Sequence, residues 1–464
     1  MKEFYLQSLD KVSTVDGREC LFSNNLSDYL SESALHKNRF IIEVKYLIEL
    51  CNKTTFAPIL FPSEKKKLLE LCENIDVKAI AEYDHFGRNN VGPFEHDVKA
   101  VEYYLREKLE EIQLSHLSEW IHFGLTSEDV NNLAYSTMLK SCFDELINKN
   151  IIVFLKKLST QANHHKKTVV LGKTHGMNAS PTTIGKRFSY FVSLVDDIFQ
   201  NLQTFNFSGK FSGAVGNNNA LKVVAPDFDF INFAKTFVNS LSFSYENTSN
   251  QRSNHLQISR LFNEVKLLNN VLIDFCEHIR HSVMIGTIKQ ISNKNHVGSS
   301  VMPHKINPWQ FEVAQGYLEQ SNCQINGLSS GIMQSLFERD LTDHPWERSY
   351  GEILAKMLIS LNYINDALDT LVVDVDFCKQ QLLESPEVLT EALQIAGRML
   401  GVSDIYIKIK NESRGMSLNR NQINDLINKY LPDSTIKTNL LNLKLEDYIG
   451  DAEEIVSLAV KKYV

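Results

Sequence analysis

Residues that interrupt helices are scarce in this chain, which has 20 glycines and 10 prolines in 464 residues. Neither residue occurs between Leu125 and Leu171, and neither occurs between Asp227 and Ile285. Proteins rich in strands place turn residues at much shorter intervals. The two windows therefore argue against a strand-rich fold and predict long helices.

Long apolar runs and blocks of one charge are also missing. No run approaches the roughly 18 apolar residues needed to cross a bilayer, and the N-terminus lacks the basic start and apolar core of a signal peptide. The longest basic block is Lys65–Lys67, in a chain of net charge −8. This balance argues against a nucleic-acid partner and against a membrane-surface role. An anionic ligand would have to be met by local cations.

The seven cysteines form no C-x-x-C pair and no cluster with histidine, and their odd number fits poorly with a disulfide framework. We therefore expect a cytoplasmic protein. The sequence has no cluster with metal-ligand spacing and no glycine loop of the kind that cradles phosphates. It indicates neither a metal nor any other cofactor.

The composition is otherwise that of an ordinary globular protein, 43% apolar and 22% charged. From Leu139 to Leu158, and again from Ile353 to Leu371, apolar residues recur every three or four positions and form one helical face. Helices of this length exceed the diameter of a small domain, so part of that face is expected to pack against other subunits. We predict an all-α fold with three helical domains: residues 1–116, a central long-helix bundle over residues 117–370, and residues 371–464.

The most informative stretch is Gly298–Pro308, which reads Gly-Ser-Ser-Val-Met-Pro-His-Lys-Ile-Asn-Pro. Asn307 followed by Pro308 is typical of an N-cap and a first helical residue, and Gln310 could complete a capping box. Lys305 stands just before this helix start, so an ammonium group and free backbone N–H groups would meet a bound carboxylate together. The arrangement suits removal of a proton next to a carboxylate. An ordinary serine-rich loop that caps a helix is the alternative.

This stretch resembles the signature of the fumarase/aspartase superfamily, whose members release fumarate from succinyl-type substrates. Within that superfamily, other segments resemble the adenylosuccinate lyase family of the longer bacterial type. In chain order they are Val15–Arg18, His96–Tyr103, His122–Phe123, Thr126–Leu133, Lys173–Gly176 and Arg339–Asp343.

The resemblance implies a fumarase/aspartase-like fold and a homotetramer in which three chains contribute to each active site. It also implies a small-molecule substrate, a succinylated nucleotide. Adenylosuccinate would give AMP and fumarate. The succinylated aminoimidazole carboxamide ribonucleotide (SAICAR) would give AICAR and fumarate, both in purine biosynthesis.

The resemblance further assigns the catalytic roles. Ser299 is the expected general base, with Ser300 in its place if the register is shifted by one residue. A serine hydroxyl is a weak acid, so this role requires cations and N–H groups that stabilise the alkoxide. His175 is the expected general acid, since an imidazole can protonate a departing nitrogen near neutral pH. We expect Ser180 and Pro181 to start a helix shortly after it.

The remaining candidates would bind the substrate. Thr126 and Ser127 are expected to cap the first long helix and, by the resemblance, to hold one end of the succinyl group. Arginine is expected at phosphate and carboxylate groups, because its planar fork matches their oxygens. The binding residues that the resemblance implies are Arg18, His96, Asp97, His122, Thr126, Ser127, Gln251, Ser300, Lys305, Asn307, Arg339 and Arg348.

Several positions depart from the family pattern, most of them on the nucleotide side. They are Glu19, Glu95, Met177, Asn178, Val313, His344 and Pro345. A carboxylate such as Glu19 near a phosphate would repel it unless Arg18 neutralises that charge. These departures leave two alternatives open. One is a lyase that releases fumarate from another succinylated amine, such as argininosuccinate or a modified nucleotide; the other is a non-catalytic helical assembly protein.

Overall fold

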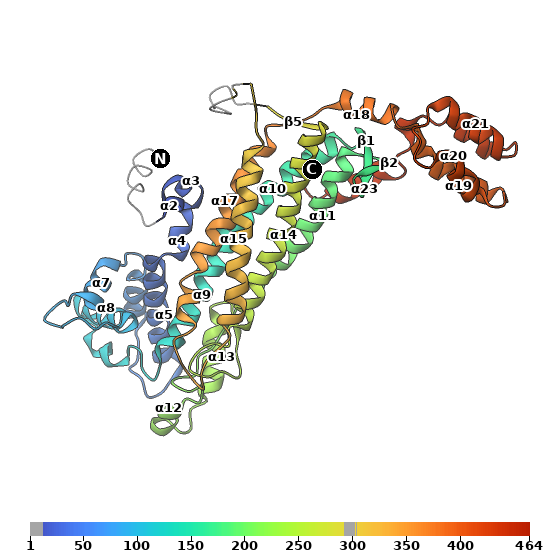
Figure 1. Ribbon diagram of the computed structural model, residues 1–464. Coiled ribbons are helices and arrows are strands. Elements are labelled where there is room, and N and C mark those ends of the chain that lie inside the picture. Colours follow the sequence, from blue (N-terminus) through green and yellow to red (C-terminus); the bar gives the residue numbers. More distant parts are fainter. Residues whose placement is uncertain (1–12, 292–301, 303) are drawn as a thin grey trace. The chain divides into compact units, whose positions relative to one another are not determined.

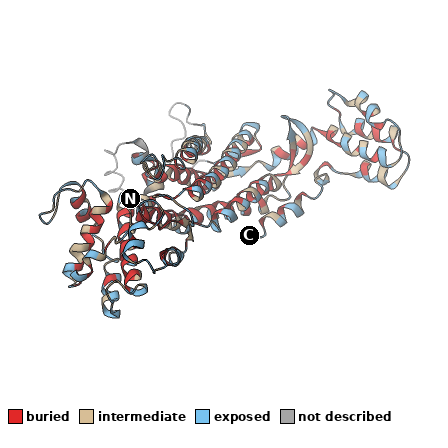
Figure 2. Ribbon diagram, turned by 90° about the horizontal axis from the view of Figure 1, so that it is seen from below, coloured by how far each residue is buried: buried red, intermediate tan, exposed pale blue. Residues whose placement is uncertain are grey.

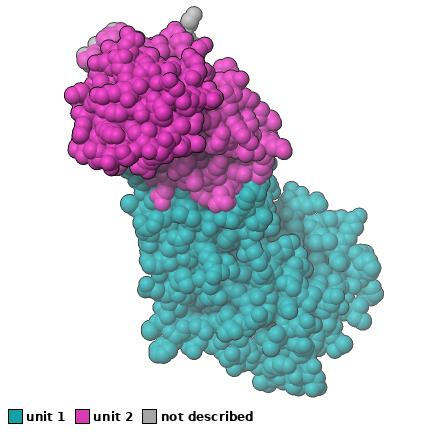
Figure 3. Space-filling view, turned by 90° about the vertical axis from the view of Figure 1, so that its right-hand side faces the viewer, with its two compact units in different colours: residues 1–150, 199–269, 317–359 teal, residues 151–198, 270–316, 360–464 magenta. Residues whose placement is uncertain are grey.

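The computed structural model describes residues 13–291, 302 and 304–464 of the chain. In this part the protein is mostly helical, with six short strands in three two-stranded sheets (Figure 1). The chain forms two compact units, each built from three separate stretches of sequence (Figure 3). Unit 1 comprises residues 1–150, 199–269 and 317–359, and unit 2 comprises residues 151–198, 270–316 and 360–464.

Unit 1 begins with several short helices and the long helix α5. The elements of this stretch are α2 (Thr14–Arg18), α3 (Cys20–Ser23), η1 (Asn24–Leu26), α4 (Ser27–Leu30), α5 (Glu32–Lys53), α6 (Pro62–Glu70), α7 (Val77–His85), α8 (Asp97–Glu111), η2 (Ser115–Trp120), α9 (Ser127–Cys142) and the π-helical turn η3 (Phe143–Ile147). Helices α5 to α8 and η2 share a core that includes Phe40, Leu47, Ile80 and Leu105, all fully buried. This core packs α8 against α5 and α7.

Later stretches of sequence complete unit 1. They contain β3 (Ser208–Gly209), α12 (Asn219–Val224), α13 (Phe230–Ser240), β4 (Ser244–Tyr245), α16 (His344–Glu347) and a portion each of α14 (Leu256–Ile285), α15 (Trp309–Gly331) and α17 (Tyr350–Leu368). Strands β3 and β4 pair in parallel. Asn269 of α14 donates to Ser321 Oγ of α15 (3.1 Å), which donates to the Ile353 carbonyl in α17 (3.2 Å). Within unit 1 these three helices therefore lie side by side.

Unit 2 contains the remaining helices and two antiparallel strand pairs, β1 with β2 and β5 with β6. Its elements are α10 (Asn148–His164), β1 (Val169–Thr174), β2 (Met177–Thr183), α11 (Ile184–Gln203), β5 (Ile288–Gln290), β6 (Leu371–Val373), α18 (Val375–Leu383), η4 (Pro386–Leu389), α19 (Thr390–Met399), α20 (Ile405–Ser413), α21 (Arg420–Tyr430), α22 (Thr435–Asn442), η5 (Leu445–Asp447) and α23 (Ala452–Val460). The last helices share a core that includes Leu389, Leu393, Ile423 and Ile427.

The long helices predicted from apolar spacing are confirmed. α9, η3 and α10 follow one another without a break from Ser127 to His164. Leu139, Ile147, Phe154 and Leu158 of the predicted face are fully buried, and Figure 2 shows how burial alternates with exposure along such helices. No helix among the described residues is both long enough and apolar enough to span a bilayer. The division into three domains stays a prediction.

Two predicted helical windows are interrupted, although they contain no glycine or proline. Between Asp227 and Ile285, α13 ends at Ser240 and α14 begins only at Leu256. The intervening residues are rich in serine and asparagine, whose side chains bond to the local backbone and compete with helix formation. The helix predicted from Ile353 to Leu371 ends at Leu368, and Leu371–Val373 pairs with β5 instead. Tertiary pairing overrides helical spacing there.

Candidate functional site

The predicted general acid lies at the tip of the β1–β2 hairpin in unit 2. His175 and Gly176 form its two-residue loop, both with positive φ (54° and 77°), as a type I′ turn requires. The His175 side chain is exposed. Gly172 permits the close pairing at the hairpin's bulge, because a Cβ there would lie 2.2 Å from the Ser180 carbonyl oxygen. His175 therefore stands in a tight turn between two paired strands.

The predicted helix start at Ser180 and Pro181 is wrong. Both residues belong to strand β2, and α11 begins at Ile184. Thr183, whose Oγ1 accepts from Lys186 N (3.0 Å), caps that helix. The pairing of β2 with β1 outweighs the local signal, since Pro181 lies at a position that needs no N–H donor to the neighbouring strand.

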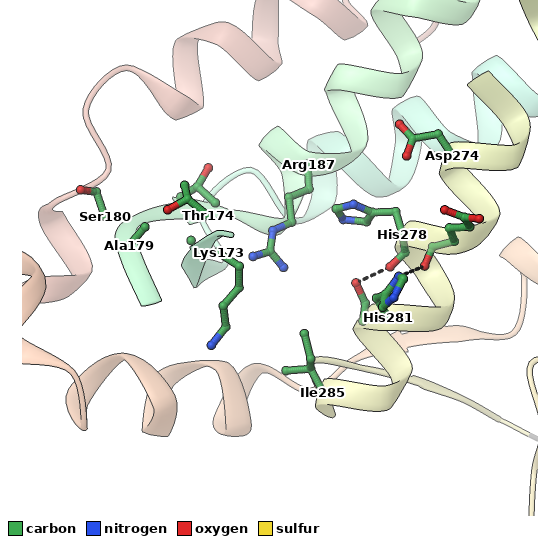
Figure 4. Close-up of a pocket in the computed structure, with 13 residues that line it drawn as sticks. Lys173, Thr174, Ala179, Ser180, Arg187, Asp274, His278, His281 and Ile285 are labelled. Carbon is green, nitrogen blue, oxygen red and sulfur yellow. Dashed lines mark hydrogen bonds between the residues drawn. The ribbon is translucent and has the colours of Figure 1, made fainter. Parts of the chain in front are cut away.

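A cavity of about 640 Å³ lies beside this hairpin, within unit 2 (Figure 4). Lys173 and Arg187 bring positive charge to it, and Asp274 on α14 brings a carboxylate. His278 of α14 faces Arg187 in the close-up. Burial and the Arg187 charge together lower the pKa of His278 to about 4, so its ring is neutral near pH 7. An anionic group entering this cavity would meet Arg187, one of whose N–H groups already donates to the Leu171 carbonyl (2.9 Å).

The signature stretch is only partly described. Ser299 and Ser300 lie outside the described residues. Lys305 is exposed and Asn307 is half-buried, and helix α15 begins at Trp309, one residue after the predicted start at Pro308. The Gln310 side chain accepts a hydrogen bond from Gln290 Nε2 (2.8 Å). Lys305 and Asn307 thus stand at a helix start, as predicted.

A second cavity, of about 990 Å³, lies within unit 1. It gathers residues that are far apart in the sequence, from the starts of α8 and α9, the loop before α14, and the segment around α16. Six of the predicted binding residues line it: His96, Asp97, Ser127, Gln251, Arg339 and Arg348. The departures Glu95 and His344 line it as well. This cavity is the main candidate for a substrate-binding site in unit 1.

His96 and Asp97 open helix α8 at the wall of this cavity. His96 is the N-cap, and its Nδ1 accepts from Lys99 N (3.2 Å), so a neutral ring carries its proton on Nε2 and can donate from there. Asp97 pairs with Arg39 (2.8 Å). Burial alone would raise the pKa of Asp97, but the charge and hydrogen bond of Arg39 and the backbone N–H of Val98 together outweigh it and lower that pKa. Arg39 also donates to Asn131 Oδ1 (2.8 Å), which links α5 to α9.

The start of α9 is fixed by a buried carboxylate. Thr126 is the N-cap, and Asp129 Oδ2 accepts from Thr126 N (2.9 Å), as the predicted capping box requires. Asp129 also accepts from the backbone of Ser212 (2.8 Å) and Gly213 (3.1 Å) and pairs with Lys210 (2.8 Å). Asp129 and Lys210 are both fully buried. Ser127, directly after the cap, faces the cavity.

Arg339 is the centre of the charged cluster in this cavity. Its Nη1 contacts both Asp343 oxygens (2.9 and 2.7 Å), and its Nη2 contacts Glu128 Oε1 (3.1 Å). Burial alone would raise the pKa of Asp343, but the hydrogen bond from His255 and the Arg339 charge lower it to about 2. Burial and the charges of Glu128 and Asp343 hold the pKa of Glu347 well above its usual range, which favours a neutral carboxyl.

The predicted residues Arg18 and His122 do not line this cavity. His122 Nδ1 lies 2.5 Å from Glu43 Oε1, and its backbone N–H donates to Glu43 Oε2 (3.2 Å). Burial alone would lower the pKa of His122, but the Glu43 charge and hydrogen bond raise it. Arg18 is exposed and lies 3.8 Å from the buried Glu19, to which Tyr317 also donates (3.4 Å). Arg18 and Tyr317 thus both contact the Glu19 carboxylate.

Sequence reasoning missed two residues that position the predicted ones: Glu43 and Arg39. Glu43 is a carboxylate on the apolar face of α5, between Phe40 and Leu47, and is fully buried. A charged residue at a core position is the signal that could have identified it, because buried charges need a partner. That the partner is His122, far along the chain, is visible only in the fold.

Comparison with known proteins gives a consistent result. A family model described as "Lyase" matches residues 65–327, and one described as "Adenylosuccinate lyase C-terminal" matches residues 335–449. The chain is 33% identical to an adenylosuccinate lyase of Legionella pneumophila strain Corby over 454 residues, covering 97% of this chain and 99% of that protein. It is also 33% identical to the adenylosuccinate lyase of Escherichia coli K12 over 456 residues, with the same coverage.

Solved structures show the same fold at lower identity. A fumarate lyase from Mesorhizobium sp. BNC1 superposes with a TM-score of 0.74 at 16% identity, covering 95% of this chain and 98% of that chain. A 3-carboxy-cis,cis-muconate lactonizing enzyme from Pseudomonas putida gives a TM-score of 0.70 at 21% identity, covering 96% of each chain. At such identities the match establishes the fold, and a shared fold hosts several reactions.

Proposed function

We infer the reaction of this chain from its family, for the chain belongs to the adenylosuccinate lyases, C–N lyases of the fumarase/aspartase superfamily. We propose that it converts adenylosuccinate to AMP and fumarate, and SAICAR to AICAR and fumarate. The observation that carries this proposal is 33% identity to adenylosuccinate lyases over 97% of the chain. The proposal needs no metal or cofactor chemistry.

The elimination requires a base on one side of the succinyl–nitrogen bond and an acid on the other. Ser299, as alkoxide, takes the proton from the carbon next to a carboxylate; the C–N bond then breaks, and its electron pair passes to the nitrogen. His175 donates a proton to that nitrogen. The exposed hairpin tip supports this role. It presents the imidazole to solvent on a short turn, where the ring is not buried in the protein core.

Charge that develops on the succinyl carboxylate needs cations and N–H donors aimed at it. Lys305 and Asn307 supply an ammonium and an amide beside the start of α15. Thr126 and Ser127 supply hydroxyls, and Ser127 also a backbone N–H, at the start of α9, where the helix dipole favours a carboxylate. We assign the two ends of the succinyl group to these two helix starts.

The phosphate is assigned to the cavity in unit 1. Arg339 is already engaged by Asp343 and Glu128, whereas Arg348 lines the same cavity and has no ion pair among the described residues. Arg348 is therefore the guanidinium best placed to receive an oxyanion. Gln251 is expected to contact the substrate from the loop before α14. Arg18 is a third candidate cation, although the nearby Glu19 carboxylate, 3.8 Å away, offsets part of its positive charge.

We further propose that the active protein is a homotetramer whose active sites combine residues of three chains. The long apolar faces of the helices and the family resemblance support it. Helices such as α14 expose apolar side chains that include Leu267 (49%) and Met284 (75%), as helices at a subunit interface do.

A different amine is the main alternative, because Glu95 and Met177 depart from the family pattern. Incubating the purified protein with adenylosuccinate, SAICAR and argininosuccinate in parallel, and measuring fumarate release, separates the possibilities. We expect release from the first two. Release from argininosuccinate alone would replace the proposed substrate and keep the elimination.

Ser299→Ala tests the proposed general base; a non-catalytic assembly protein would release no fumarate either before or after the substitution. We expect kcat to fall by roughly 100-fold to 10,000-fold, since the variant lacks the proposed base. Circular dichroism and gel filtration should match the unchanged protein, because the substitution removes only a hydroxyl. Unchanged turnover in a folded Ser299→Ala protein would reject Ser299 as the base, and Ser300→Ala would then be the next variant.

A further inference from the structure

His344 lies between a cation and an anion in the unit 1 cavity. Its Nε2 is 2.7 Å from Arg339 Nη2 and 3.3 Å from Glu128 Oε1. A guanidinium offers only donors, so the contact with Arg339 requires a lone pair on Nε2 and a proton on Nδ1. The contact with Glu128 requires the opposite, a proton on Nε2. No single proton state of His344 satisfies both neighbours.

Two segments supply the charged groups next to His344 in the chain and in its contacts, and the same cavity is also lined by Glu32, Asp84, His85, Glu95, His96 and Asp97. Glu128 lies on α9, while Arg339, Asp343, Glu347 and Arg348 lie in or beside α16. Arg339 also contacts Asp343 and Glu128, and neither of these contacts involves the His344 ring. Arg339 therefore stays anchored when the imidazole changes partner. What changes is the charge that the ring itself brings to the cavity.

The second ring nitrogen is available to a ligand. His344 lines the cavity, its side chain is 28% exposed, and its Nδ1 makes no hydrogen bond within the described part of the chain. Arg348 follows His344 by one helical turn and lines the same cavity. An oxyanion held by Arg348 would lie near the Nδ1–H of His344, and a protonated ring binds an anion more tightly than a neutral one.

We propose that His344 couples binding of an oxyanion to uptake of one proton from solvent. In the empty cavity Nε2 accepts from Arg339. When a phosphate or carboxylate binds, Nε2 takes up a proton and donates to Glu128, while Nδ1–H donates to the oxyanion together with Arg348. The identity of the ligand, a nucleotide or a dicarboxylate product, rests on the proposed function; the proton coupling rests on the geometry of His344, Arg339 and Glu128.

Calorimetric titration of the protein with AMP, and separately with fumarate, tests this coupling. Each titration is run in two buffers of different ionisation enthalpy near pH 6.5, where an imidazole can exchange a proton. The phosphate of AMP itself titrates near pH 6, so the quantity of interest is the difference in proton uptake between the unchanged protein and a His344 variant. Uptake with AMP alone assigns the phosphate to His344, and uptake with fumarate alone assigns a carboxylate.

Two variants imitate the two proton states. His344→Gln can accept from Arg339 through its amide oxygen, so we expect it to lose the extra proton uptake and to bind the anion about tenfold more weakly near pH 6. His344→Lys carries a permanent charge, so it should also lose the uptake but keep its affinity as the pH rises from about 6 to about 8. His116→Gln, at an exposed position in unit 1, is the matched control and should behave like the unchanged protein.

Equal proton uptake in the unchanged protein and in folded His344→Gln would overturn the proposal, as would a failure of both AMP and fumarate to bind. These outcomes differ from a failure of the proposed function. A protein that releases no fumarate from adenylosuccinate, yet binds AMP with uptake that depends on His344, would lose the assigned reaction and keep the proton coupling. Thermal unfolding of each variant verifies that it is folded.

Discussion

Individual side chains in this protein derive their chemistry from partners far along the chain. His175 is an exception: it stands at an exposed hairpin tip, and its ring has no hydrogen-bond or ion-pair partner within the described part of the chain. His122 is the opposite case, since the buried Glu43 is within hydrogen-bond distance of both its ring and its backbone. The two histidines therefore call for different tests.

His175→Gln tests the assigned general acid. Glutamine keeps hydrogen-bonding capacity but cannot deliver a proton, so we expect kcat to fall by roughly 100-fold to 10,000-fold with little change in stability. Steady-state kinetics with adenylosuccinate measures it. His164→Gln, a control on another histidine of unit 2, should leave kcat unchanged. A His175→Gln protein with normal kcat would remove this residue from the mechanism.

Glu43→Gln tests the pairing with His122 through the pH dependence of stability. The folded-state pKa of His122 is raised by Glu43, so its stabilisation is fully present below the unfolded-state value of about 6.5 and is lost as the pH rises through the folded value. Glutamine removes the charge that raises this pKa. We expect the loss of stability above about pH 6.5 that is linked to His122 to shrink in the variant.

Urea unfolding of both proteins across this pH range gives the comparison. The control is Glu119→Gln, a variant of an exposed glutamate, which should leave the profile near neutral pH unchanged. Parallel profiles for the unchanged protein and Glu43→Gln would mean that the His122–Glu43 contact contributes nothing to pH-dependent stability.

Several of the proposed binding residues lie at the N-terminal ends of helices. Asp97, Ser127 and Lys305 each stand at or near the first residue of a helix, at α8, α9 and α15. The start of α9 depends on Asp129, which connects the cap at Thr126 to the loop that carries Lys210. The loop and the helix start are therefore expected to move together.

Asp129→Asn tests this dependence. Asparagine leaves the buried Lys210 without its counter-charge, so we expect the free energy of unfolding to fall by about 3–5 kcal/mol, as for other buried pairs from which one partner is removed. Denaturant unfolding measures it. Asp144→Asn, which removes an exposed i,i+4 partner of Lys140, should cost no more than about 0.5 kcal/mol. The double variant Asp129→Asn, Lys210→Met should recover part of the loss, and equal stability of the single and double variants would contradict the argument.

In the proposed homotetramer, the general base Ser299 and the general acid His175 of one active site can come from different chains. If Ser299 and His175 of one site come from different chains, an inactive Ser299→Ala protein and an inactive His175→Gln protein should regain activity when they are unfolded together and refolded as a mixture. Random mixing places both native residues in about a quarter of the sites, so about a quarter of normal activity is expected. If both residues of a site come from one chain, the mixture stays inactive.

Much of the fold could be predicted from local pattern. The absence of glycine and proline together with the three-and-four spacing of apolar residues predicted α9, α10 and α17, because an amphipathic helix records its buried face in every turn. The break between α13 and α14 could not be predicted from glycine and proline alone, since serine and asparagine can end helices too. Strand β2 and its Ser180–Pro181 were missed because strand pairing is a contact between segments, and no local signal encodes it.

For the candidate site too, some features follow from the local sequence and others depend on the tertiary structure. Its residue types, the turn at His175 and the cap at Thr126 are set by short stretches of sequence, because turns and caps are made by neighbours in the chain. The gathering of His96, Ser127, Gln251, Arg339 and Arg348 around one cavity depended on the fold. So did the partners that set the pKa of Asp343 and His122, because electrostatic energies depend on distance and burial in space, and neither follows from position along the chain.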